Sequence, residues 1–372
     1  MKTKKDFFNT QSDLTACKIM FYRYYLQNYL AKVLMQFGRC FIADFFCGPG
    51  KNGSNDGSPL VLLECASNML NSPVLKKKWP SAEIVILFSD KEKTAIDNLK
   101  SILNTRISAA NIKILGPFCE TFQGVVKKTA NDYQKIKEPK FFFLDPFGYS
   151  DVRINDIKVL MGCPASEVLL FLPTFHSYRF HKIANGISAL KMFLDEFTNR
   201  GCADYVDIDD FNESIRQKLL LHIGLEYVRA IKLDDGKCKN ALFYLTKHIT
   251  GMLIMNDLAW KYAQDGVSVK SKNNNELTLF DLSTTSGNYT SIKQSFIDYL
   301  KHEKQVSNVD IISFVAKNCF TTEYARGILR ELKKSNKIDI EYLDKSKTKG
   351  FYVANNHWKN KLAVIKYRIE IK

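Results

Sequence analysis

One short stretch decides the fold: residues 40–50, which read CFIADFFCGPG. The run from Cys40 to Phe46 is almost wholly apolar, as expected of a strand buried on both faces of a parallel sheet. The CGPG sequence that follows is typical of a turn and excludes regular structure. A strand that ends in a G-x-G turn lets the backbone approach a ligand at the carboxyl edge of the sheet. The stretch therefore predicts an α/β fold with a binding site at that edge.

Strands and helices alternate on both sides of this stretch. The residue patterns predict helices at 13–37, 60–70, 91–103 and 121–133, and further strands at 83–88, 113–115, 140–144 and 166–172. Such alternation is typical of a parallel, doubly wound sheet.

The end of this region departs from the alternation. A helix at 211–223 precedes two strands, 225–233 and 241–247, which a short polar turn joins. Strands joined in this way pair antiparallel. A parallel sheet that ends in an antiparallel hairpin is the arrangement of Rossmann-like class I methyltransferases, and this is the predicted fold class.

The C-terminal part has a different pattern. Residues 266–290 are mostly polar and predict a linker. Beyond them the patterns predict helices at 291–302, 308–318 and 322–335, and strands at 338–342 and 350–354 around a basic loop. Three helices and a basic hairpin are the outline of a winged helix. We therefore expect a Rossmann-like domain with an N-terminal helical extension at 1–265, the linker, and a small winged-helix domain at 291–372.

The composition limits the possible partners. Lys and Arg number 54 against 39 Asp and Glu, which gives a net charge of +15. This excess indicates nucleic acid as a partner, and a lysine-rich composition without such a role is the alternative.

The nine cysteines include no C-x-x-C pair, so we expect neither a disulfide framework nor a metal site. No apolar run reaches the roughly 18 residues of a membrane span, so we expect no membrane contact and a cytoplasmic location.

The first candidate site motif is the G-x-G turn. In a dinucleotide site a helix begins at once, but here the loop 51–57 delays it until Ser58, so tight pyrophosphate capture is not expected. A carboxylate two residues before F-x-G-x-G suits S-adenosylmethionine, whose ammonium and sulfonium groups are cationic. A tight structural turn is the alternative. The candidate cofactor-binding residues here are Asp44, Phe46, Gly48 and Gly50.

A second acidic motif, FSDKE at residues 88–92, ends the next predicted strand. An acidic side chain at this place in an α/β sheet accepts hydrogen bonds from ribose hydroxyls. Asp90 is the first candidate for this cofactor contact and Glu92 is the second. The alternative is that Asp90 caps the following helix, and both roles can hold together.

The third motif is FFFLDPFGYS at residues 141–150, in which a very apolar strand delivers a carboxylate, a proline and aromatic side chains to the sheet edge. It matches the logic of the D-P-P-[YF] motif of amino-directed methyltransferases, in which the Asp side chain and the proline carbonyl accept hydrogen bonds from the target amine. An aromatic residue then stacks on a planar substrate. A proline turn after a buried strand is the alternative. The candidate catalytic residues are Asp145, Pro146, Phe147 and Tyr149.

Basic residues mark the predicted third helix of the C-terminal domain and the loop after it. Regularly spaced cations on a helix suit contacts with nucleic-acid phosphates. The alternative is a solvated face of a winged helix that binds protein. The candidate nucleic-acid contacts are Arg326, Arg330, Lys333, Lys345, Lys347 and Lys349.

Together these motifs resemble the three-Cys-motif partner family (TcmP), a bacterial family of methyltransferases known from sequence. The resemblance covers residues 15–263 and includes the motifs at 44–50, 57–59, 88–92 and 143–150 and the segment LFYLTKH at 242–248. It implies the methyltransferase fold, S-adenosylmethionine as cofactor and a three-Cys-motif protein as partner. The chain departs from the family at Cys47, where a small residue is usual, at Asp90, where glutamate is usual, and at Pro117, where an acidic residue is common.

The sequence thus predicts an S-adenosylmethionine-dependent methyltransferase that acts on an exocyclic amine of a nucleic-acid base. One alternative is a nucleic-acid or protein-binding module whose methyltransferase fold has lost turnover. A third hypothesis is a protein methyltransferase.

Overall fold

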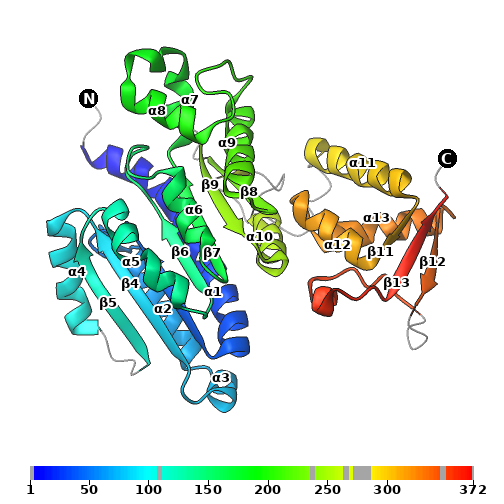
Figure 1. The fold of residues 1–372 in the computed structure, drawn as a ribbon, viewed down its shortest axis with the longest axis horizontal. Helices are drawn as coiled ribbons and strands as arrows, with labels where there is room; N and C mark the ends of the chain where they lie inside the picture. Colours follow the sequence, from blue (N-terminus) through cyan, green and yellow to red (C-terminus); the bar gives the residue numbers. More distant parts are fainter. Residues whose placement is uncertain are drawn as a thin grey trace. The chain divides into compact units, whose positions relative to one another are not determined.

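The computed structural model describes residues 4–106, 111–234, 239–262, 268–270, 286–343 and 349–370. The chain divides into two compact units, Met1–Lys247 and His248–Lys372 (Figure 1). Each unit is described by itself below.

The first unit is built on a mainly parallel sheet with the strand order β8-β9-β7-β6-β1-β4-β5. All neighbours are parallel except at β9, which runs antiparallel to both β7 and β8. The predicted parallel sheet with an antiparallel terminal hairpin is therefore confirmed. The strands are β1 (Arg39–Asp44), β4 (Glu83–Asp90), β5 (Ile112–Cys119), β6 (Lys140–Leu144), β7 (Ser166–Leu172), β8 (Tyr227–Asp234) and β9 (Lys239–Thr246).

The strand order places β1 between β4 and β6. The chain therefore winds outward from β1 in one direction through β4 and β5, and then in the other direction from β6. Ligands of open α/β sheets bind at the carboxyl ends of the strands where this reversal occurs. The ends of β1, β4 and β6 are thus the place to look for a site.

Helices cover both faces of this sheet. On one face α5, α6, α8 and α9 share a continuous apolar core with β1, β6 and β7. The helices of the first unit are α1 (Lys4–Phe37), α2 (Ser58–Leu70), α3 (Pro73–Lys78), α4 (Lys93–Arg106), α5 (Phe122–Lys135), α6 (Ile154–Gly162), α7 (Thr174–Phe180), the 3-10 helix η1 (His181–Gly186), α8 (Ser188–Phe197) and α9 (Ile208–Ile223).

The long helix α1 packs on the other face, against alternate residues of β6. The ring of Tyr22 stacks on Phe143, with centroids 4.2 Å apart, and Tyr25 and Tyr29 each lie 5.4 Å from Phe141. Four helical residues rise about 6 Å and two strand residues about 6.6 Å, so the side chains of the two elements stay in step. Residues later in α1 contact residues earlier in β6, so α1 runs antiparallel to β6.

The second unit carries its own small sheet. The strands follow the order β11-β13-β12, and both pairs are antiparallel. Its apolar core includes Phe296, Phe314 and Phe320, whose rings contact one another. The elements are α10 (Ile249–Tyr262), β10 (Ser268–Lys270), α11 (Ser286–Glu303), β11 (Gln305–Ser307), α12 (Asn308–Lys317), α13 (Thr322–Lys334), β12 (Ile338–Tyr342), the 3-10 helix η3 (Asn355–Lys361) and β13 (Ile365–Ile369).

The boundaries differ from those expected. Helix α10 was assigned to the first domain, but it belongs to the second unit because its polar side chains bond there. Asn256 donates to the carbonyl of Phe320 at 3.2 Å, and Trp260 donates to the carbonyl of Cys319 at 2.9 Å. The stretch expected to be a linker contains β10 and the start of α11, and its residues 271–285 lie outside the described residues.

The predicted strand at 350–354 was wrong. Tyr352 has a φ of 49°, in the left-handed region that an extended strand does not visit, and η3 follows it. The last strand is β13, where Ile365 and Tyr367 are buried and pair with β12.

Candidate functional site

Three carboxylates come to the carboxyl edge of the first sheet. Asp44 is the last residue of β1, Asp90 is the last of β4, and Asp145 directly follows β6. Asp44 lies level with Phe88 on β4 and with Phe143 on β6, so the three strands end close together. The structure thus brings together the three acidic residues that the sequence motifs singled out.

Asp44 is fully buried and only partly satisfied. The backbone N–H of Phe46 donates to its Oδ1 at 3.4 Å, while Oδ2 has no hydrogen-bond partner among the described residues. The pKa of Asp44 is raised to about 7, and burial is the largest cause. Hydrogen bonds from Ser58 and Phe46 lower this pKa, and the nearby carboxylates of Asp145 and Asp90 raise it. A buried, unsatisfied carboxylate is uncommon because desolvation penalises it, and a cationic ligand would relieve that penalty.

The two glycines of the turn have different surroundings. Gly48 has a φ of 60°, and a Cβ added to it would meet nothing within 4 Å. Gly50 has a φ of 85°, but an added Cβ would lie 3.0 Å from Leu99 of α4. Only Gly48 therefore borders open space. Gly50 is required for packing against α4, and a backbone contact between Gly50 and the cofactor stays a prediction.

Phe46 was also expected to bind the cofactor. Its side chain is 7% exposed, and its ring centroid lies 5.6 Å from that of Phe122 on α5. It belongs to the apolar core on the α5 face of the sheet, and its contact with the cofactor stays a prediction.

Asp90 holds the turn in place. Its Oδ2 accepts a hydrogen bond from the N–H of Gly48 at 2.9 Å, and its Oδ1 accepts one from the N–H of Glu92 at 2.9 Å. Asp90 is 1% exposed, whereas Glu92 lies at the surface just before α4. Asp90 is not the N-cap of α4, because that helix begins at Lys93 and Asp90 bonds the N–H of Glu92 before it. Of the two candidates for a ribose contact, Glu92 is the exposed one.

Asp145 has a partner that the sequence motifs did not reveal. The Nζ of Lys18, on α1, lies 2.5 Å from Oδ2 of Asp145, and the two side chains are 11% and 21% exposed. The same Nζ lies 4.6 Å from the ring centroid of Phe171 on β7. Lys18 is one helical turn before Tyr22, on the face of α1 that packs on β6. Only this spacing could have indicated that Lys18 reaches the sheet edge.

The loop after Asp145 presents one aromatic residue to solvent. Phe147 is 70% exposed, while the ring of Tyr149 lies 5.7 Å from Phe193 on α8 and Pro146 is buried. Asp151 fixes the loop, since its carboxylate accepts from the N–H of Gly148 at 3.3 Å and pairs with Lys91 at 2.9 Å. Phe147 is therefore the aromatic residue free to stack on a substrate, and Tyr149 has a packing role.

No metal site is evident in the described ranges. They contain no group of three or more His, Cys, Asp or Glu side chains arranged to hold a metal ion. In the same part of the chain, no helix is both long enough and apolar enough to cross a membrane.

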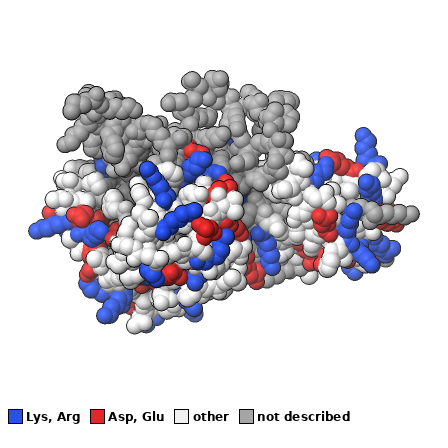
Figure 2. Space-filling view, turned by 90° about the horizontal axis from the view of Figure 1, so that it is seen from above, with Lys and Arg blue, Asp and Glu red and all other residues white. Residues whose placement is uncertain are grey.

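The basic residues predicted to contact nucleic acid lie in the second unit. Arg330 and Lys333 are exposed on α13, and Lys349 is exposed as well. Arg326 is only partly exposed, and its Nε is buried. Lys and Arg side chains gather at the right-hand end of Figure 2, which belongs to this unit. Lys345 and Lys347 lie outside the described residues.

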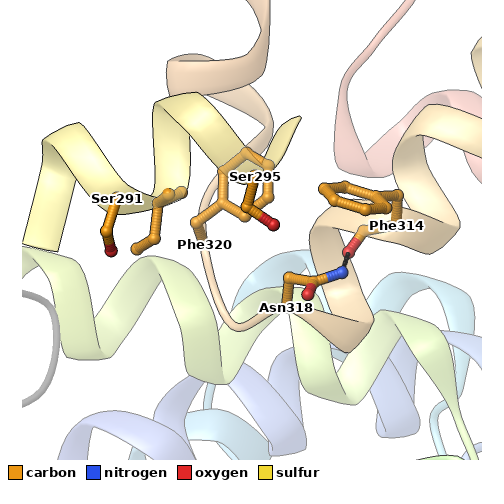
Figure 3. A pocket seen from close by; sticks show the side chains of 6 residues that line it. Ser291, Ser295, Phe314, Asn318 and Phe320 are labelled. Carbon is orange, nitrogen blue, oxygen red and sulfur yellow. Dashed lines mark hydrogen bonds between the residues drawn. The ribbon is translucent and has the colours of Figure 1, made fainter. Parts of the chain in front are cut away.

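A small cavity of about 190 Å³ lies in the second unit between α11 and the end of α12 (Figure 3). The amide of Asn318 at its wall donates to the carbonyl of Phe314 at 2.9 Å, which satisfies the end of α12. None of the predicted site residues lines it. The full lining is Ser291, Ile292, Ser295, Phe314, Asn318 and Phe320.

No known protein family and no curated protein matches the sequence. Among solved structures, WbdD is 10% identical with a TM-score of 0.32, and the match covers 66% of this chain and 41% of WbdD. The methyltransferase PaMTH1 of Podospora anserina, solved with SAH bound, is 12% identical with a TM-score of 0.27, over 60% of this chain and 78% of its own. The small RNA methyltransferase HEN1 is 10% identical with a TM-score of 0.32, over 60% of this chain and 25% of its own. At such TM-scores none of these likenesses identifies the function of this chain, which spans about two fifths of WbdD.

Proposed function

We propose that this chain is an S-adenosylmethionine-dependent methyltransferase that acts on an amino group, with a nucleic-acid base as the acceptor. One observation carries the proposal. Asp44, whose buried Oδ2 has no hydrogen-bond partner among the described residues, ends β1 at the reversal point of the sheet, and Gly48, where an added Cβ would meet nothing within 4 Å, follows four residues later. A cationic group bound there would satisfy the carboxylate, and S-adenosylmethionine carries two cationic groups.

The residues present fit this cofactor. Asp44 would hold a cationic group, Gly48 would leave room for the ligand, and Glu92 would bind ribose hydroxyls. When bound, the cofactor supplies a methyl group on an electrophilic sulfonium. Asp90 acts indirectly, since its hydrogen bond from Gly48 fixes the turn and its hydrogen bond from Glu92 fixes the backbone before α4.

The acceptor side is formed by the loop after β6. Asp145 and the carbonyl of Pro146 would accept hydrogen bonds from the target amine and aim its lone pair, while Phe147 would stack on a planar group. Holding the amine in this way supplies the orientation on which methyl transfer depends.

The second unit supports nucleic acid as partner. In this proposal the unit is a winged helix, and its order of helix, strand, two helices and two strands, with β13 between β11 and β12, is compatible with that assignment. In this proposal α13 is the recognition helix, and Arg330, Lys333 and Lys349 contact phosphates. The resemblance to the three-Cys-motif partner family, and a partner of that kind, remain proposals.

The experiment that tests the function is incubation of the chain with a methyl-labelled donor and a host extract, with nucleic acid and protein scored separately. Label in the nucleic-acid fraction that depends on Asp145 supports the proposal. Label in the protein fraction alone supports the alternative of a protein methyltransferase. A chain that labels neither fraction and binds no cofactor is a binding module instead.

A further inference from the structure

The ammonium of Lys18 has two partners and no others among the described residues. Its Nζ lies 2.5 Å from Oδ2 of Asp145 and 4.6 Å from the ring centroid of Phe171, which is 8% exposed. A carboxylate and the face of an aromatic ring are two strong partners for an ammonium group in a protein. The arrangement therefore has two of the features of an ammonium site, and the chain's own lysine occupies it.

Helix α1 does not depend on this ion pair for its position. Tyr22, one turn along, stacks on Phe143, and Tyr25 donates a hydrogen bond of 2.6 Å to the buried Glu167 of β7. The backbone at Lys18 is thus fixed by neighbouring contacts. A lysine has a flexible four-carbon stem, so its ammonium can leave Asp145 while the helix stays in place.

The site also opens toward the place where an acceptor would bind. Asp145 keeps 21% of its side chain exposed, and the exposed ring of Phe147 follows two residues later. The oxygen that Lys18 uses is one of only two that Asp145 offers. An amine that takes the position between Oδ2 and the ring of Phe171 must therefore displace Lys18.

We propose that Asp145 and Phe171 form a primary-ammonium site, which Lys18 fills in the free chain and which an external amine occupies by displacing Lys18. The inference rests on the proposed function in one respect, since that function makes Asp145 the group that holds the target amine. The target amine reacts in its neutral form, because an ammonium ion has no lone pair, so Lys18 competes with it only for the oxygens of Asp145, and an external ammonium ion serves as the probe of the site.

The test replaces the lysine with a free amine. In Lys18→Ala the side chain ends at Cβ, and n-propylammonium supplies the missing atoms. Thermal unfolding of the full chain is followed while n-propylammonium chloride is added, with sodium chloride and n-propanol as controls for ionic strength and for the apolar stem. Lys18→Met, whose side chain replaces all four stem atoms and lacks only the nitrogen, is titrated with ammonium chloride in the same way, so the test survives if the alanine variant folds poorly.

We expect saturable stabilisation of the Lys18 variants by the matching ammonium ion and not by the controls. The wild type should respond with an apparent affinity roughly tenfold weaker or more, as competition with one charge-assisted hydrogen bond predicts. The double variant Lys18→Ala/Asp145→Asn should not respond. An equal response in the wild type, or one that survives loss of the Asp145 charge, overturns the proposal, as does no response in either Lys18 variant.

These titrations contain no cofactor, so their failure differs from failure of the proposed function. Binding of n-propylammonium at Asp145 without binding of S-adenosylmethionine would support the ammonium site and contradict the proposed methyltransferase function. Binding of S-adenosylmethionine by a chain whose Lys18 variants do not respond to ammonium ions would support the function and contradict the role of Lys18.

Discussion

Lys18 and Asp145 are 127 residues apart in sequence, yet the ammonium of one lies 2.5 Å from the carboxylate of the other. The pair lies next to the side-chain contacts between α1 and β6, where Tyr22 stacks on Phe143 and Tyr25 lies against Phe141. The aromatic contacts therefore place a charged pair at the sheet edge, beside the loop that carries Phe147.

The space at Gly48 can be tested by filling it. In Gly48→Val the new side chain would enter the open region beside the turn, and calorimetry should show loss of S-adenosylmethionine binding. Gly53 is the matched control, because it too has a positive φ, 63°, and open space around an added Cβ. Gly53→Val should suffer similar backbone strain, about 1–2 kcal/mol, and keep the cofactor. Equal affinity in the two variants would remove Gly48 from the site.

Asp44 makes the stability of the chain depend on pH. Burial raises its folded pKa to about 7 from 3.8, so the folded state holds a proton that the unfolded chain releases between these values. Asp44 therefore lowers stability progressively as pH rises from about 4 to about 7. Asp44→Asn, which cannot ionise, should be more stable than the wild type by about 2–4 kcal/mol at pH 8 and by little at pH 4, as measured by denaturant unfolding. A difference that is constant with pH would contradict the burial of an ionising Asp44.

The same variant should lose the cofactor. A cationic ligand favours the ionised form of Asp44, so the affinity of the wild type should fall as pH drops below about 7, with proton release on binding near that pH. Calorimetry in buffers of different ionisation enthalpy measures this release. Stable Asp44→Asn protein that binds S-adenosylmethionine as tightly as the wild type would show that Asp44 does not hold the ligand.

Asp145 should affect turnover far more than fold. Asp145→Asn offers a donor where the target amine needs an acceptor, so turnover should fall at least about a hundredfold while cofactor affinity is unchanged. The change also breaks the pair with Lys18, at a cost of about 1–3 kcal/mol. Lys18→Met breaks the same pair from the other side and should lose similar stability but retain turnover. Comparable activity in the two variants would show that Asp145 has only a structural role.

The basic face of α13 should contribute charge to nucleic-acid binding. Arg330→Ala and Lys333→Ala should each weaken binding to duplex DNA of any sequence and reduce the slope of affinity against salt by about one. Lys301→Ala is the control, since Lys301 is equally exposed but lies on α11. A salt slope that the α13 variants leave unchanged would favour a protein partner for this unit.

The sequence predicts the sheet and its three carboxylates because each signal is local. Asp44, Asp90 and Asp145 each stand at the end of an apolar run, and parallel strands bring such ends to one edge. The place of Lys18 depends on how α1 lies on β6, and no local pattern contains that information. Gly48 and Gly50 stand in the same turn motif, and the sequence does not show that Leu99 packs against Gly50 and leaves the space at Gly48 open. The last strand was misplaced because Tyr352 has a positive φ, which its residue type does not predict.

Titration of the wild-type chain with S-adenosylmethionine by calorimetry tests the central claim most directly. The account predicts saturable binding of one cofactor per chain, lost in Asp44→Asn and Gly48→Val and kept in Gly53→Val and Asp145→Asn. Folded wild-type protein that binds no S-adenosylmethionine, or that binds it equally in all four variants, would contradict the assignment of this sheet edge as a methyltransferase site.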